Sequence, residues 1–129
     1  MAVSHSVAAR NAATDAVLAL IGASGRLRFR LAGTVAAPGT SVANLGFSAT
    51  AFGASSSGTA TANAITSDTN AAGNASPVAT ATFETSGGTV VVHCAVAASA
   101  SDINLSNGLT VAAGDTVSCS SLTYTALPA

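Results

Sequence analysis

The sharpest alternation of apolar and polar residues lies between Arg26 and Ala32, where the chain reads RLRFRLA. Leu27, Phe29 and Leu31 fall on one parity, and the arginines fall on the other. An alternation with a period of two is typical of a strand that buries one face. This segment is therefore the clearest strand in the sequence, and its apolar side is predicted to face a core.

Shorter segments with strand character follow, separated by clusters of Gly, Pro, Asn and Ser that predict turns. Strands are predicted at residues 40–48, 58–65, 78–85, 89–96, 102–105 and 116–125. Residues 90–96 are apolar on both parities, which predicts a central strand covered on both sides. The apolar parity changes within 116–125, so a β-bulge or bend is expected near Ser120 and Ser121.

A helical period occurs near the N-terminus, over about residues 6–21. Ser4 or Ser6 can cap this helix, and Gly22 can end it in the left-handed conformation. One face is predicted to be apolar and the other largely polar; the apolar face comprises Ala9, Ala13, Ala16, Val17 and Leu20, and the polar face comprises Arg10, Asn11, Thr14 and Asp15. The helix either packs on the sheet or serves as an arm that contacts a neighbouring subunit.

One helix and about seven short strands predict a mainly β fold, an antiparallel β-sandwich or small barrel with an N-terminal α-helix. The length of 129 residues, without a whole-domain repeat or dividing linker, predicts a single domain over residues 1–129. Much of the apolar content is alanine, so the expected core is thin. A protomer that completes its core against a partner is favoured over a marginal monomer.

Charge is scarce, at 7% of the residues, and the net charge is −1. We expect neither nucleic-acid binding nor a polybasic membrane module, because both require a basic surplus. Three of the four arginines, Arg26, Arg28 and Arg30, share one face of the predicted strand. This face is either a solvated surface that discourages edge pairing or a basic ridge that docks on an acidic partner.

No residue spacing indicates a catalytic, metal or cofactor site, and we expect a protein that is not an enzyme. Cys94 and Cys119 are either free, buried thiols or, in a second interpretation, a bridge between neighbouring strands. The N-terminus lacks the basic region of a signal peptide, and no window approaches a transmembrane length. Synthesis and use in a cytoplasm are therefore expected.

Three segments carry a resemblance to a known family. They are the helix AARNAATDAVLALI with the strand RLRFRL, the central AFGASSSGTATANAITSDTNA, and the C-terminal SDINLSNGLTVAAGDTVSCSSLTYT. Together they resemble small virion proteins of tailed bacteriophages, a family whose members are similar to capsid decoration, or cement, proteins. The resemblance covers nearly the whole chain.

This resemblance implies a structural protein on the outer surface of an icosahedral capsid, a homodimer or homotrimer that bridges subunits of the major capsid protein. The candidate contacts are the arginine face of Arg26, Arg28 and Arg30 and the arm of Ala2, Val3, Ser4, His5 and Ser6. The alternative is another phage structural component, such as a tail, fibre or head-completion protein. A surface adhesin or carbohydrate-binding module is a third interpretation, with Phe52 and Tyr124 as candidates for sugar stacking.

Overall fold

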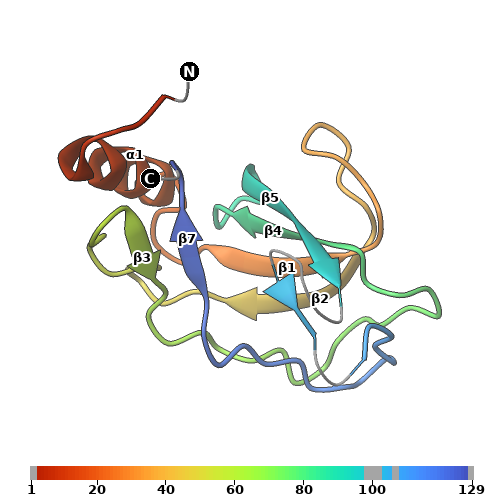
Figure 1. Cartoon of the computed structure of the whole chain (residues 1–129). Coiled ribbons are helices and arrows are strands. Elements are labelled where there is room, and N and C mark those ends of the chain that lie inside the picture. The colour runs from red at the N-terminus through yellow and green to blue at the C-terminus, as the bar shows by residue number, and fades with distance from the viewer. Residues whose placement is uncertain (1–2, 98–102, 106–107, 128–129) are drawn as a thin grey trace.

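The computed structural model describes residues 3–97, 103–105 and 108–127 of the chain, apart from the side chain of Asn104. Its elements in order are α1 (Val7–Ala19), β1 (Arg26–Arg30), β2 (Ser41–Gly46), β3 (Thr59–Thr61), β4 (Thr80–Glu84), β5 (Val90–Ala97), β6 (Ile103–Asn104) and β7 (Thr123–Thr125) (Figure 1). The predicted mainly β fold with one N-terminal helix is confirmed. Its sheets remain open and do not close into a barrel. The expected strand at 102–105 begins with Asp102, which lies outside the described residues.

The larger sheet has five strands in the order β2-β1-β4-β5-β6. The first four strands pair antiparallel, and β6 adds a short parallel pairing to the end of β5. Strand β1, the segment with the sharpest alternation, therefore lies between two neighbours rather than at an edge. Its residues Leu27 and Phe29 are almost completely buried, as the pattern predicts.

The smaller sheet pairs β3 with β7, and its side chains complete the core of the larger sheet. Phe83 joins the layers, because its ring lies 5.7 Å from Phe47, 5.8 Å from Phe52 and 6.1 Å from Tyr124 between centroids. Phe52 reaches this cluster from a loop outside the named strands. Ala60 of β3 is 1% exposed, so a small residue allows the two layers to approach closely.

The strand covered on both sides is β4 and not β5, which corrects the prediction for residues 90–96. All five residues of β4 are buried, including the polar Thr80, Thr82 and Glu84. In contrast, β5 is half-buried over residues 90–94. The burial of β4 could not be predicted from a run of apolar residues, because three of its five residues are polar. Long arginine side chains on the neighbouring strand cover these polar residues.

Ser6 caps the start of helix α1, and its hydroxyl accepts a hydrogen bond of 3.1 Å from the amide of Ala9. Gly22 follows the helix with φ +69°, the left-handed conformation expected there. The predicted apolar face is wrong as the packing face. Leu20 is 66% exposed and Ala16 is exposed, whereas the polar Thr14 is completely buried.

The polar side of α1 packs because it hydrogen-bonds the turn at residues 55–58, part of the central segment. The Thr14 hydroxyl donates to the Gly58 carbonyl at 2.6 Å, and the Gly58 amide donates to Asn11 Oδ1 at 2.7 Å. The Ser55 amide donates to Asp15 Oδ1 at 3.0 Å. These bonds satisfy backbone groups that the turn would otherwise leave unpaired.

The outer edge of β2 is covered by the segment at 66–73. Gly46 exchanges backbone hydrogen bonds of 3.1 and 2.8 Å with Thr66, and the Asn44 amide donates to the Asp68 carboxylate at 2.8 Å. Gly73 then takes φ +71°, and a Cβ there would overlap the backbone nitrogen of Ala113. Glycine is thus required for two reasons where this segment crosses the C-terminal part of the chain.

The C-terminal segment is less regular than predicted. Only residues 123–125 form a strand, and Val117 makes a single bridge with Asp68. The expected change of phase is confirmed as a bend at Ser120, after which Leu122 is buried.

Candidate interaction surface

The three arginines of β1 lie on the outer face of the larger sheet, opposite the face that carries the core. Arg28 stands between Asn44 on β2 and Thr82 on β4, and Thr82 stands next to His93 on β5. Since β1 is an interior strand, protection of a sheet edge is excluded as the role of these arginines. We call Arg26, Arg28 and Arg30 the arginine face.

A buried carboxylate holds part of this face in place. Glu84 is completely buried, and its Oε2 accepts hydrogen bonds from Nη2 and Nε of Arg30 at 2.7 and 3.2 Å. The Thr82 hydroxyl also donates to Oε2, and Arg28 Nε lies 3.4 Å from Oε1. Arg30 is further fixed by a bond of 2.7 Å from Nη1 to the Gly39 carbonyl. A buried acid can remain charged only when paired in this way.

The three arginines therefore differ in what they can offer a partner. Arg30 is used internally, and its side chain is 12% exposed, against 24% for Arg28. Arg26 is half-buried, and its side chain forms no hydrogen bond or ion pair with the described part of the chain. Arg26 is thus the most available arginine, with Arg28 beside it.

The few charges of the chain are unevenly distributed along its elements. The arginine face together with Glu84 carries a formal charge of +2, and the remaining charged residues of the sequence, Arg10 and four aspartates, carry −3. A chain with so few charged residues gains a distinct positive patch because the fold gathers three of its four cations on one sheet face.

The N-terminal arm lies apart from both sheets and leads into α1 (Figure 1). Val3 is 79% exposed, and Ser4 and His5 are also exposed. Ser6 serves as the cap of the helix, and Ala2 lies outside the described residues. The arm and the arginine face are separate surfaces.

Two residues on the same side of the sheet as the arginines, Glu84 and His93, were not expected there from the sequence. His93 Nε2 is buried and makes no hydrogen bond with the described residues. Thr80, Thr82 and Glu84 alternate along β4 and therefore share one face, which the sequence does indicate. Only the pairing of β1 with β4 shows that this face lies beside the arginines.

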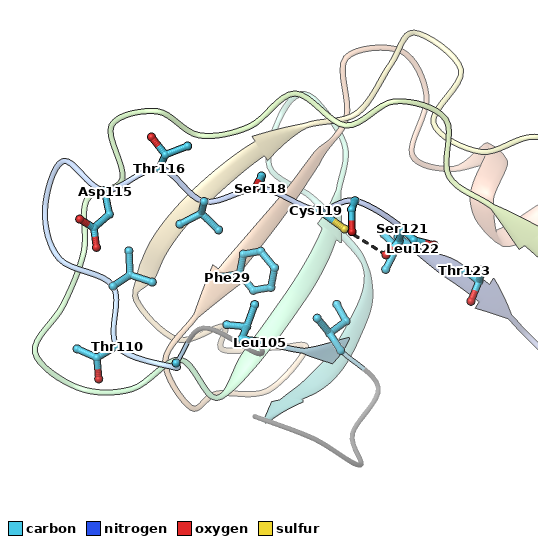
Figure 2. Close-up of a pocket in the computed structure, with 15 residues that line it drawn as sticks. Phe29, Leu105, Thr110, Asp115, Thr116, Ser118, Cys119, Ser121, Leu122 and Thr123 are labelled. Carbon is cyan, nitrogen blue, oxygen red and sulfur yellow. Dashed lines mark hydrogen bonds between the residues drawn. The ribbon is translucent and has the colours of Figure 1, made fainter.

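A hollow of about 580 Å³ lies between β1 and the C-terminal segment. Figure 2 shows Phe29 at its centre, with Thr116, Ser118 and Thr123 around it. Its titratable lining groups are Asp115 and Cys119. Asp115 accepts a hydrogen bond of 2.9 Å from the Ala112 amide, so the carboxylate stabilises its own turn.

Neither cysteine forms a disulfide bond. Burial raises the pKa of the Cys119 thiol above its ordinary value of 9.0, although a hydrogen bond to the Ser121 carbonyl opposes the shift. Burial also raises the pKa of Tyr124. Within the described ranges, no group of three or more His, Cys, Asp or Glu residues is arranged to hold a metal ion. No helix there is long and apolar enough to span a membrane.

Comparison of the chain with models of protein families, with curated proteins and with solved structures finds no match. The fold and surface define a small, mainly β domain with one positively charged sheet face.

Proposed function

We propose that the protein is a structural component of a phage virion that binds the outer surface of an icosahedral capsid and bridges subunits of the major capsid protein. The resemblance of three sequence segments to virion proteins supports this proposal. The structural observation that carries it is the arginine face, a positive patch on a rigid sheet in a molecule that is otherwise negative.

The arginine face suits contact with an acidic protein surface. Glu84 and the strand ladder hold Arg28 and Arg30 in place, so little side-chain freedom is lost when a partner binds. Arginine recognises carboxylates through two parallel hydrogen bonds, which fixes orientation as well as charge. Arg26 would make the first contact, and the exposed arm from Val3 to Ser6 would supply a second, so that weak contacts add up on a shell with many sites.

Locating the chain in particles tests the proposal directly. Particles of the phage that encodes it would be purified and imaged by cryo-electron microscopy. Density for the β domain on the outer shell, in register with the capsid lattice, is the expected result. Density confined to the tail, or particles that lack the chain, would overturn the proposal.

The contact itself is tested by single substitutions, because replacing all three arginines would leave the buried Glu84 carboxylate without a cationic partner. Arg26→Ser should lower occupancy on undecorated shells and weaken its dependence on salt concentration. Arg10→Ser is the matched control, since it removes the same charge from α1, outside the arginine face. Equal occupancy for both folded variants would refute the role of the arginine face.

A further inference from the structure

A groove of about 400 Å³ lies between the C-terminal half of α1 and the loop at residues 49–54. It shares no residue with the arginine face. Its walls are mostly small and apolar, and Leu18, Ala19 and Phe52 are among the residues that form them. Asp15 is the one charged residue in its lining. The groove is thus apolar, with a single carboxylate on its wall.

The Asp15 carboxylate has an oxygen to spare. Its Oδ1 accepts a hydrogen bond of 3.0 Å from the Ser55 amide, which holds the side chain toward the loop. Asp15 is exposed, and both ion pairs among the described residues belong to Glu84 rather than to this aspartate. Asp68, in contrast, uses both of its carboxylate oxygens for backbone amides. The second oxygen of Asp15 can therefore accept a hydrogen bond from a ligand.

The end of α1 adds to the negative potential at the groove. Ala19 is the last residue of the helix, and it lines the groove together with Gly22 and Ala23. Carbonyl groups at the end of a helix carry a partial negative charge, which basic residues in the last turn commonly balance. The last turn of α1 contains no basic residue. The helix end and Asp15 both favour a cation as the occupant.

The loop wall has backbone groups without a partner. Phe52 is held by an isolated bridge. On one side of it the Asn63 amide donates to the Ala51 carbonyl at 2.9 Å, and on the other the Gly53 amide donates to the Thr61 carbonyl at 3.0 Å. Because groups alternate along an extended chain, the N–H and C=O of Phe52 point away from this pairing. No described residue takes them up, and Phe52 is 6% exposed. Unpaired backbone groups in a buried residue are a reason to expect an outside partner.

We infer that the groove binds a lysine side chain carried by an extended segment of another protein. The aliphatic part of the lysine lies along Leu18 and Phe52, and its ammonium group reaches the free oxygen of Asp15 and the carbonyls at the end of α1. The main chain of the segment pairs with the N–H and C=O of Phe52, as an added strand does.

Lysine fits this groove better than arginine does. The Ser55 amide already occupies one carboxylate oxygen, whereas arginine pairs best with two. A volume at the low end of the roughly 300–1,000 Å³ of ligand sites suits one long side chain. The chain itself contains no lysine, so the segment belongs to a different protein and not to a second copy.

Titration of the isotope-labelled full chain with short peptides, followed by nuclear magnetic resonance, tests the site. The probes are acetylated and amidated Ala-Val-Lys-Val-Ala and the same peptide with norleucine in place of lysine. The lysine peptide should shift the amide signals of residues 49–54 and of the second half of α1 to saturation. The norleucine peptide keeps the apolar part, and it should bind about tenfold more weakly or less, because it lacks the charged hydrogen bond.

A substitution at the carboxylate tests the same contact from the side of the protein. Asp15→Asn removes the charge but keeps an oxygen that can accept from the Ser55 amide, so the loop stays in place. It should lower the affinity for the lysine peptide by about tenfold. Asp115→Asn is the matched control and should bind like the wild type, because Asp115 is also exposed and accepts one backbone amide, that of Ala112.

The inference is overturned by equal affinities for the two peptides, by shifts that lie outside the groove, or by equal losses for the two aspartate variants. It does not rest on the proposed function. Failure of the lysine peptide to bind would leave the arginine face untouched, and a chain that ignores shells would overturn the proposed function alone.

Discussion

Replacement of Arg30 by alanine should destabilise the protein far more than the same replacement at Arg26. Arg30 supplies two of the hydrogen bonds to the buried Glu84 carboxylate and closes the β1–β2 loop through Gly39. Removing one partner of a buried ion pair costs about 3–5 kcal/mol, because a charge remains buried without compensation. That is a large part of the roughly 5–15 kcal/mol that stabilises a typical domain.

Urea unfolding followed by circular dichroism measures this difference. The loss at Arg30 corresponds to a fall in melting temperature of about 10–20 °C for a chain of this size. Arg26→Ala should change the free energy of unfolding by less than about 0.5 kcal/mol, as expected for a side chain that forms no internal hydrogen bond or ion pair. The double variant Arg30→Met with Glu84→Met should recover most of the loss, since it removes the buried charge with its partner. Equal losses for the two alanine variants would refute the reasoning.

Three further predictions follow from packing and titration. Thr14→Val should cost about 1–3 kcal/mol by leaving a buried carbonyl unpaired, whereas Leu20→Ala should be nearly neutral; thermal melts that reverse this order would contradict the packing of α1. Gly73→Ala should destabilise strongly because of positive φ and backbone overlap, whereas Gly87→Ala, which meets no atom closer than 3.8 Å, should not; similar melting temperatures would count against the crossing described. The raised pKa of Cys119 means that its unfolded form loses the proton first, so stability should be full below the ordinary value of 9.0 and fall as pH rises above it. Urea titrations at rising pH should show a smaller fall for Cys119→Ser, and an unchanged slope would exclude this thiol as a cause.

The parts of the fold that depend on neighbouring residues were predictable from the sequence. The alternation in RLRFRL identified β1 and its buried face, and Ser6 and Gly22 marked the ends of α1. Phase change near Ser120 correctly indicated a bend. Each of these features follows from local periodicity or from the conformational preference of one residue.

The features that escaped prediction depend on non-local pairing. The packing face of α1 is decided by hydrogen bonds to a turn 40 or more residues away, which override the apolar pattern of a helix rich in alanine. Burial of β4 depends on arginines from β1. The arginine face was found from sequence, but Glu84, which makes it rigid, became visible only when β1 and β4 were seen to pair.

The buried hydroxyl of Thr14 also has a consequence for the order of folding. Besides donating to Gly58, it accepts a hydrogen bond of 3.1 Å from the amide of Ala126, 112 residues further along the chain. During synthesis the helix is made long before this part of its docking site. The helix therefore reaches its final position only after residue 126 has left the ribosome, and a chain truncated before β7 should retain a loosely attached helix.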